Sequence, residues 1–419
     1  MLGETYRPMT SVEQWFFNSQ MNTHIGFEFE RPDFIPTAVQ RLKERILGLH
    51  LRCENGMIIS TNNPIEVNDL PKECNTAGKA TRWVIDNKMP NPTERLATIS
   101  AGNSCIVMSM NHMIADGTLL LQTIHNIAHD FKPILPKLPI APDITFEKDI
   151  KELMKSEKFK STLYDSSKYT RLYPKYSENL QNQNSNNSKH HPVDTIEYRV
   201  PISEMQCYNR EKDNVHNLTE ALLNSLLLSA VAYNGRWTGP LVAYSCVNLR
   251  QYLTKEQIRN PGICCHFSDV TVEADAPLHA TVGELTKQFK YTLKERIKQK
   301  ECLVHIGDLA PQPKTGLQFE LSNVGQVTWK SPVKNVYFQV GCGKFGRPMT
   351  MDLFCHSMIV DSFNNVEMKL QFPTDQISWK EADLIGRSVG FGLRSISDKM
   401  TIKEAIDAFE GYQKLLRKA

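Results

Sequence analysis

The sequence has neither a strong excess of charge nor a long apolar run. Its formal net charge is only +3 over 419 residues, with 49 Lys and Arg scattered among 46 Asp and Glu. Such a balance gives no electrostatic footprint for nucleic acid, so no nucleic-acid partner is expected. No apolar run approaches the roughly 20 residues that a membrane span needs. We therefore expect no transmembrane span.

Secretion signals and regular cysteine spacing are also missing. The first thirty residues contain neither a basic segment nor an uninterrupted apolar run, so a secretory signal is not expected. The ten cysteines include the adjacent pair Cys264 and Cys265 but no CxxC, which argues against a disulfide framework or a zinc site. These absences predict a cytoplasmic protein with reduced thiols. Peripheral association with a membrane or lipid droplet remains an open alternative.

Length and composition predict a folded chain of two parts. A single core stops growing at roughly 250–300 residues, and this chain is longer. It is 41% hydrophobic and 23% charged, which is ordinary for a globular protein. The stretch 175–195 is rich in Asn, Gln and Ser and nearly free of aliphatic residues, which is typical of a linker. We predict an N-terminal half over 1–174, a linker over 175–195 and a C-terminal half over 196–419.

Strand and helix patterns occur in both predicted halves. Residues 104–112 form a short, continuously apolar run, which indicates a strand buried on both faces. From Gly117 onward, apolar residues recur every three or four positions, which indicates an amphipathic helix. The stretch 218–233 predicts a buried helix, and 240–249 predicts a strand that runs into Arg250. The stretch 316–325 is also strand-like. The pattern therefore predicts an α/β chain.

The candidate catalytic residues lie where the buried strand ends. His112, Asp116 and Gly117 form an HxxxDG motif in the turn between that strand and the following helix. A histidine at the tip of a strand can project into a cleft, and its ordinary pKa near 6.5 suits proton abstraction close to neutral pH. A core histidine without a catalytic role is the alternative. Asp116 either orients the imidazole or serves the scaffold.

Metal binding is not predicted. His125 and His129 share the i, i+4 spacing that a metal can bridge, but no third ligand is evident, so a solvated surface pair is expected.

The last helix has Ile402, Ile406, Phe409 and Leu416 on one face. This face is expected to dock onto the core rather than onto a membrane.

Placed at a strand-to-helix turn, HMIADG resembles the HxxxDG signature of the coenzyme A-dependent acyltransferase superfamily. Two later stretches resemble that family in order: VNLRQYL followed by GICCHF over 247–267, and ELSNVGQVTWK over 320–330. The plant enzymes' DFGWG is replaced by YFQVGCGKFGRP, and Asn111 replaces the first histidine of the HHxxxDG found in condensation domains. The branch of fungal alcohol acetyltransferases and sphingoid-base N-acetyltransferases is the best match.

The resemblance implies an α+β sandwich of two chloramphenicol-acetyltransferase-like halves with an active-site tunnel between them. His112 is then the general base, and Asp116 turns away from it to pair with an arginine for which Arg250 is the candidate. Gly117 permits the close turn, with an ordinary helix entry as the alternative. Ser322 or Asn323, in a predicted SNVG turn, would supply an oxyanion donor, with a plain loop as the alternative. Lys344 and Arg347 are candidates for contacts with the coenzyme A phosphates.

The predicted function is transfer of an acyl group, most simply acetyl, from acyl-CoA to a hydroxyl or amine, by a monomer with no permanently bound cofactor. Acyl-CoA acts as the co-substrate, and the acceptor is a small or lipid-like alcohol or amine. Two alternatives stay open. The chain is either a non-catalytic binding or regulatory protein of the same fold, or a condensation-type enzyme that takes its acyl group from a carrier-protein thioester.

Overall fold

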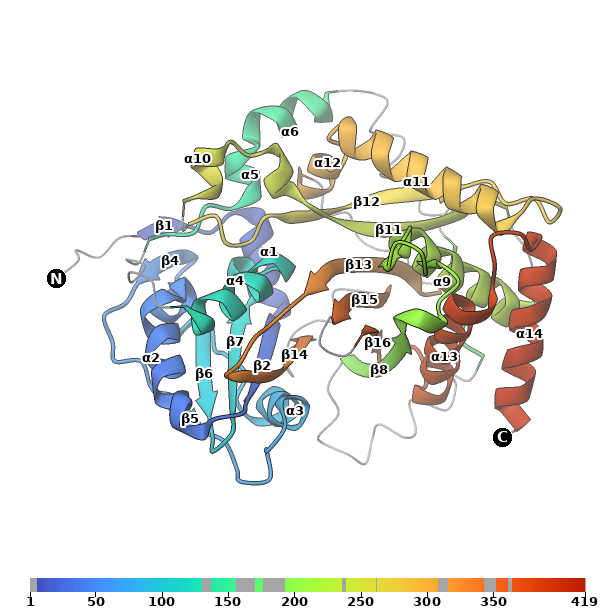
Figure 1. Ribbon diagram of the computed structural model, residues 1–419. Coiled ribbons are helices and arrows are strands. Elements are labelled where there is room, and N and C mark those ends of the chain that lie inside the picture. Colours follow the sequence, from blue (N-terminus) through green and yellow to red (C-terminus); the bar gives the residue numbers. More distant parts are fainter. Residues whose placement is uncertain are drawn as a thin grey trace. The chain divides into compact units, whose positions relative to one another are not determined.

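The computed structural model describes most of the chain (Figure 1). The described residues are 6–129, 137–155, 170–175, 193–235, 239–260, 262–307, 316–342, 352–360 and 364–418. Contacts divide the chain into two compact units. Unit 1 consists of Met1–Glu147, Asn248–Phe267 and Thr328–Met349, and unit 2 of Lys148–Val247, Ser268–Val327 and Thr350–Ala419.

Unit 1 is built on a five-stranded sheet in the order β14-β2-β7-β6-β5. All neighbouring pairs in it are antiparallel except β5 and β6. The central strand β7 is buried at every residue, as its unbroken apolar pattern predicts. The strands are β2 (Met21–Phe29), β5 (Val67–Asp69), β6 (Ala97–Ala101), β7 (Cys105–Asn111) and β14 (Val333–Cys342). A smaller antiparallel sheet holds β1 (Tyr6–Pro8), β4 (Met57–Ser60) and β3 (Leu51–Glu54).

Two helices of unit 1, α2 and α3, pack on this five-stranded sheet. Helix α3 contacts β2, β7 and β14, and Val107 of β7 joins a buried cluster with Ala80 and Val84 of α3. Helix α2 contacts β6 and β7 and packs against α4. The helices are α1 (Ser11–Ser19), α2 (Ile35–Arg45), α3 (Ala77–Asn87), α4 (Gly117–Ala128), α5 (Pro142–Thr145) and α10 (Lys255–Ile258), with short 3-10 turns η1 (Pro32–Phe34), η2 (Leu47–His50), η3 (His112–Ile114) and η7 (Leu249–Tyr252).

Unit 2 is built on a six-stranded mixed sheet in the order β12-β11-β13-β15-β16-β8. The pairs β11–β13 and β13–β15 are parallel, whereas β15–β16 and β16–β8 are antiparallel. The strands are β8 (Val193–Pro201), β11 (Leu241–Asn248), β12 (Phe267–Ala274), β13 (Gln318–Val327), β15 (Asp352–Val360) and β16 (Asn365–Pro373), and a separate hairpin holds β9 (Tyr208–Asn209) and β10 (Asn214–Val215).

A buried helix, α9 (Leu218–Asn234), lies at the centre of the helical layer of unit 2 (Figure 1). It contacts α11, α13 and α14, and few of its residues reach the surface. The predicted docking of the last helix is confirmed, because Ile402, Ile406 and Phe409 are buried and Gln413 Nε2 donates to the carbonyl oxygen of Ser229, 2.9 Å away. The other helices are α6 (Glu147–Met154), α11 (Val282–Lys298), α12 (Cys302–Gly307), α13 (Trp379–Ser395) and α14 (Ile402–Lys418), with the 3-10 turn η6 (Ile202–Glu204).

The predicted α/β class is confirmed by these mixed sheets and helices. The units alternate along the chain, whereas the predicted halves are consecutive. Most of the predicted linker over 175–195 lies outside the described residues, and the predicted boundaries stay a prediction. Among the helices of the described residues, none is both long enough and apolar enough to cross a membrane.

Candidate functional site

His112 lies in unit 1, immediately after the buried strand β7, as the first residue of η3. The preceding Asn111 holds the turn, because its Oδ1 accepts a hydrogen bond from the backbone N–H of Met113, 3.1 Å away. Phe16 of α1 stacks on the imidazole with ring centroids 4.9 Å apart and planes 6° from parallel. Phe267 packs against the ring with a centroid distance of 5.0 Å. Two aromatic rings therefore fix the orientation of His112.

Burial controls the protonation of His112. Only 9% of the residue is exposed, and burial lowers the pKa of the imidazole below its ordinary value, because a charged ring loses solvation. The backbone carbonyl of the residue itself and the charge of Asp116 oppose this shift, with smaller effects. Nδ1 is buried without a hydrogen-bond partner on another described residue. The ring is therefore mostly neutral at neutral pH.

Asp116 directs its carboxylate away from the imidazole. Its Oδ1 caps helix α4 by accepting from the backbone N–H groups of Thr118 (3.0 Å) and Leu119 (3.3 Å). Its Oδ2 accepts from Arg250 Nη1 (2.6 Å) and from the backbone N–H of His266 (2.8 Å). The side chain is almost completely buried. Asp116 is thus a scaffold residue that ties the motif to the segment 248–267.

Arg250 completes this buried ion pair. Arg250 follows Asp116 by 134 positions in the chain, and the two side chains pair as the resemblance implied. Its Nη2 also donates to the carbonyl oxygen of Cys264, 2.8 Å away, and its own backbone N–H is bound by Asn248 Oδ1, 3.0 Å away. Because the guanidinium is charged and nearly buried, each of these acceptors offsets part of its lost solvation.

Gly117 is the first residue of α4 and is half-buried. Its position therefore matches an ordinary helix entry, the alternative that the sequence left open.

The strand predicted over 316–325 is confirmed by β13 (Gln318–Val327), but the turn predicted within it at SNVG is wrong. Ser322 and Asn323 lie inside strand β13, where the pairing with β15 shifts register between Asn323 and Gly325. Gly325 has a φ of +85°, a conformation that favours glycine, so the glycine produces a bulge in a continuing strand. Asn323 Nδ2 donates to Thr219 Oγ1 (3.0 Å), and its Oδ1 accepts from the backbone N–H of Gly325 (3.0 Å). Both residues belong to unit 2, and their oxyanion role stays a prediction.

The remaining predicted residues are the candidates for coenzyme A contacts and the histidine pair of i, i+4 spacing. Lys344 and Arg347 lie outside the described residues. His125 and His129 are exposed on α4, with ring centroids 4.6 Å apart. Among the described residues, no group of three or more metal-binding side chains comes together.

A cavity of about 540 Å³ lies beside the HxxxDG turn within unit 1. Ile114 of η3, Met110 of β7 and Cys264 contribute to its apolar lining. Arg45, Lys137 and Arg259 add positive charge, and no acidic side chain lines it in the described part of the chain. Lys137 and Arg259 are exposed, whereas Arg45 is buried and donates to the carbonyl oxygens of Asn126 and His129 near the end of α4. The cavity therefore suits an anion that carries an apolar part.

Sequence reasoning missed His266 and the partnership of Phe16 with His112. His266 is completely buried, and its Nε2 lies 2.9 Å from Thr145 Oγ1. Burial, together with the charge of Arg250, lowers the pKa of His266 to about 4, so the ring is neutral at physiological pH. Phe16 lies in α1, and no sequence pattern shows that this helix meets a residue 96 positions later.

Comparison with known proteins yields a fold but no relative by sequence. No protein-family model and no curated protein sequence matches the chain. Solved structures do match over nearly its whole length.

One such structure is polyketide synthase associated protein 5 from Mycobacterium tuberculosis, with a TM-score of 0.64 and 14% identity over 93% of this chain and 97% of that chain. Another is the first condensation domain of the CDA synthetase, with a TM-score of 0.65 and 11% identity over 96% and 98% of the two chains. A third is the epimerization domain from the third module of tyrocidine synthetase B, with a TM-score of 0.58 and 15% identity over 98% of both chains. The chain therefore has the fold of condensation-type domains, and the predicted fold is confirmed at that level. The alcohol acetyltransferase branch stays a prediction.

Proposed function

We propose that this chain is an acyltransferase that moves an acyl group from a thioester to a hydroxyl or amine, with His112 as the general base. The observation that carries the proposal is the state of His112: a neutral imidazole, held between two aromatic rings, at the end of a buried strand. An imidazole with a lowered pKa is unprotonated at neutral pH and ready to accept a proton.

The residues of unit 1 suggest the following steps. Nε2 of His112 takes the proton of the acceptor as its oxygen or nitrogen attacks the thioester carbonyl carbon. The carbon–sulfur bond then breaks, and the imidazolium returns the proton to the departing thiolate. Phe16 and Phe267 hold the ring in place during both proton transfers. No covalent acyl-enzyme forms in this sequence.

Asp116 and Arg250 act by positioning the base. Because the carboxylate of Asp116 is bound by α4, by Arg250 and by the backbone of His266, it is not available to draw a proton from the imidazole. The ion pair instead holds the start of α4 against the segment 248–267. That segment ends in Phe267, one of the two rings that orient His112.

We favour acyl-CoA as the donor. The cavity beside the motif combines an apolar lining with Arg45, Lys137 and Arg259, which suits a thioester that carries phosphates. Lys344 and Arg347, the candidates from the sequence, lie outside the described residues and stay a prediction. The acceptor is a small or lipid-like alcohol or amine, and acetyl is the simplest acyl group.

A carrier-protein thioester is the second candidate donor. It is favoured by the match to the first condensation domain of the CDA synthetase, which spans 98% of that domain. A non-catalytic binding protein of the same fold is the remaining alternative.

Thiol release separates these candidates. The purified chain is incubated with acetyl-CoA and a panel of alcohols and sphingoid amines, and in parallel with an acetylated carrier protein. Release from acetyl-CoA that depends on the acceptor supports the proposal, and release from the carrier protein alone supports the second candidate. If neither donor reacts with any acceptor, the enzymatic proposal is wrong.

A further inference from the structure

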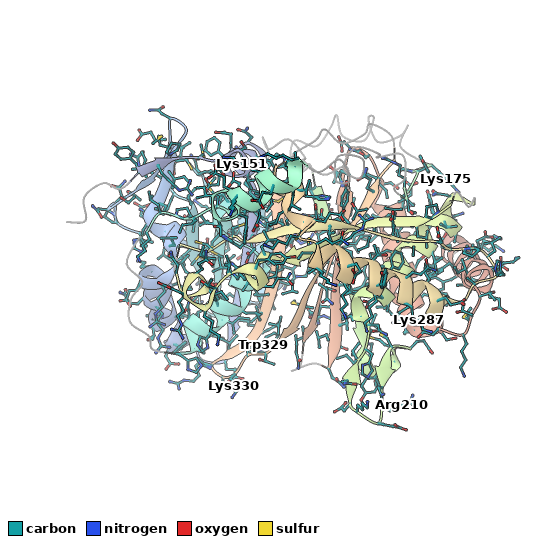
Figure 2. All side chains as sticks on the ribbon, turned by 90° about the horizontal axis from the view of Figure 1, so that it is seen from above. Lys151, Lys175, Arg210, Lys287, Trp329 and Lys330 are labelled. Carbon is teal, nitrogen blue, oxygen red and sulfur yellow. The ribbon has the colours of Figure 1, made fainter. Side chains whose placement is uncertain are left out.

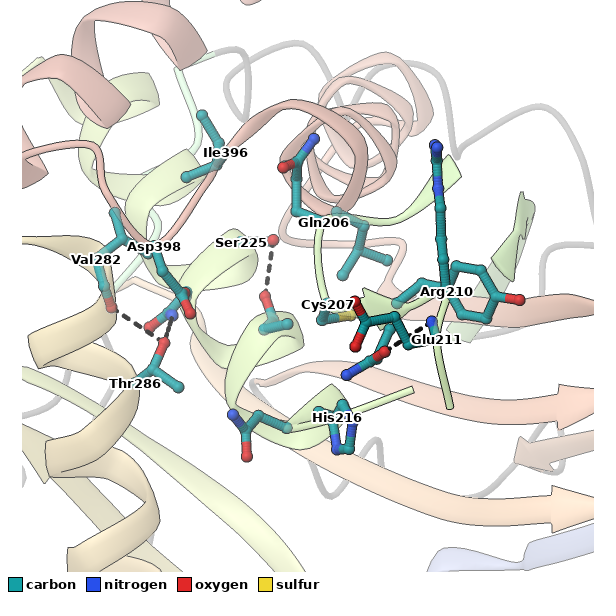
Figure 3. A pocket seen from close by; sticks show the side chains of 17 residues that line it. Gln206, Cys207, Arg210, Glu211, His216, Ser225, Val282, Thr286, Ile396 and Asp398 are labelled. Atoms are coloured by element: carbon teal, nitrogen blue, oxygen red, sulfur yellow. Dashed lines mark hydrogen bonds between the residues drawn. The ribbon is translucent and has the colours of Figure 1, made fainter. Parts of the chain in front are cut away.

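We propose that unit 2 carries a second ligand site, a pocket between α9, α11, the end of α13 and the β9–β10 hairpin, which binds a small organic ammonium that also bears hydroxyl groups. The pocket has a volume of about 560 Å³, within the usual range for small-molecule sites. All its lining residues belong to unit 2, and the inference is independent of the acyl transfer proposed above. Figure 3 shows Asp398 and Thr286 on one side of it and Cys207, Glu211 and His216 on the other.

The floor of this pocket contains an unsatisfied acceptor. Asn224 is 4% exposed, and its Nδ2 donates to Thr286 Oγ1, 2.8 Å away. Thr286 in turn donates to the carbonyl oxygen of Val282 (3.0 Å), which fixes the orientation of the amide. Asn224 Oδ1 is buried and receives no hydrogen bond from any described residue. A buried acceptor without a donor costs free energy, which a ligand N–H or O–H would recover.

A second acceptor lies next to Asn224 on the same helix. The hydroxyl of Ser225 is buried and donates to the carbonyl oxygen of Ala221, 2.8 Å away. Its proton is therefore in use, and its lone pairs are left to accept. The floor of the pocket thus calls for a ligand that donates hydrogen bonds.

The edge of the pocket is acidic. Asp398 and Glu211 are exposed lining residues, and neither carboxylate takes part in an ion pair among the described residues. Burial raises the pKa of the Cys207 thiol to about 11, and the negative charge of Asp398 adds to this shift. The charge of Asp398 therefore acts on Cys207, another lining residue, and a negative potential at the pocket edge favours a cation there.

One lining cation opposes these acids. Arg210 is exposed at the tip of the β9–β10 hairpin, and Figure 2 shows it projecting from the edge of unit 2. A solvated guanidinium at that position leaves the buried floor without positive charge. Two carboxylates at the edge and two acceptors at the floor match an ammonium with neighbouring hydroxyls, as in an amino sugar.

Isothermal titration calorimetry with glucosamine as the probe tests the site. The control ligand is glucose, which keeps the hydroxyls and lacks the ammonium. We expect the full-length protein to bind glucosamine at pH 7 in the millimolar range or tighter, and at least about fivefold more tightly than glucose, the size of one partly exposed charge contact.

Two variants locate the binding. Asp398→Asn removes an exposed charge without a buried contact and should weaken glucosamine binding by about fivefold. Asn224→Leu removes the floor acceptor and should weaken it by about tenfold or more. Asp375→Asn changes an exposed carboxylate of unit 2 that lies outside the pocket, and binding should stay unchanged. The site is refuted if glucosamine does not bind, if glucose binds equally well, or if Asp398→Asn behaves like Asp375→Asn.

Discussion

At the scale of single residues, the proposed base works without a carboxylate partner. In a catalytic triad, an acid holds and stabilises the histidine, but here Asp116 is fully occupied by a helix cap, a backbone amide and Arg250. Aromatic packing orients the ring of His112 instead. The low polarity of that packing also keeps the imidazole neutral. Orientation and protonation state therefore have the same cause.

Removing Arg250 should destabilise unit 1 strongly. Arg250→Met leaves the buried carboxylate of Asp116 without its ion-pair partner, which typically costs about 3–5 kcal/mol. Urea unfolding of the full-length protein, followed by fluorescence, measures the loss. The double variant Asp116→Asn, Arg250→Met removes both charges and should recover part of it.

A surface ion pair provides the matched comparison. Lys403 and Asp407 lie on α14 with both side chains more than half exposed, so Lys403→Met should leave the unfolding midpoint unchanged. Equal effects of Arg250→Met and Lys403→Met would contradict the structural role assigned to the buried pair.

His266 should make folding sensitive to acid. Its pKa is about 4 in the folded protein and about 6.5 in the unfolded chain, so the unfolded chain binds a proton more readily between those values. Stability is therefore lost as the pH falls from 6.5 to 4, by up to about 3 kcal/mol from this residue, and His266 contributes no pH dependence above 6.5. His112 contributes in the same direction.

Urea midpoints measured from pH 7.5 down to pH 4.5 test this expectation. His266→Gln cannot titrate, so the variant should lose less stability over that range than the wild-type protein, although other groups titrate in both. If the urea midpoints of the two proteins fall equally with pH, His266 is not the group that makes folding sensitive to acid.

At the scale of elements, the local patterns located most of the site. The apolar run before His112 predicted β7, and the change to helical spacing after Gly117 predicted α4. The SNVG prediction failed because a glycine with positive φ is equally compatible with a turn and with a bulge. Only the pairing of β13 with β15 decides between them, and that pairing joins distant parts of the chain.

The cavity between α2, α4 and α10 yields a prediction about the donor. If Lys137 and Arg259 bind phosphates, the double variant Lys137→Glu, Arg259→Glu should raise the KM for acetyl-CoA by about tenfold or more, the effect of losing charge-assisted hydrogen bonds. The KM for acetyl-pantetheine, which has no phosphate, should change little. Steady-state thiol release measures both constants.

Lys88→Glu is the control for that variant, because Lys88 is exposed on unit 1 and does not line the cavity. Equal increases of KM for both thioesters would contradict phosphate binding at this cavity.

At the scale of the whole molecule, the chain returns twice to complete unit 1. Strand β14 pairs with β2 at the edge of the five-stranded sheet, and the segment 248–267 supplies Arg250 and Phe267. Neither return is visible in composition or periodicity, because each depends on contacts between positions more than a hundred residues apart. Arg250 was assigned to Asp116 only through the resemblance.

A fragment covering the predicted N-terminal half should therefore fail to fold. Residues 1–174 lack β14, which leaves the edge of β2 unpaired, and lack Arg250, which leaves Asp116 without its partner. Size-exclusion chromatography and thermal unfolding, with the full-length chain as control, should show aggregation or no cooperative transition. A monomeric fragment with a sharp transition would contradict the interleaved organisation.

The most direct test of the account is the turnover number of His112→Ala with the best donor and acceptor found. General-base catalysis by a positioned side chain is worth about 10² to 10⁴ in rate, so kcat should fall by that factor. Because the removed ring is packed between Phe16 and Phe267, the variant should also unfold more easily, and kcat is measured where circular dichroism shows it folded. His279→Ala, at an exposed histidine of unit 2, should retain full activity. If folded His112→Ala turns over within threefold of the wild-type rate, His112 is not the base.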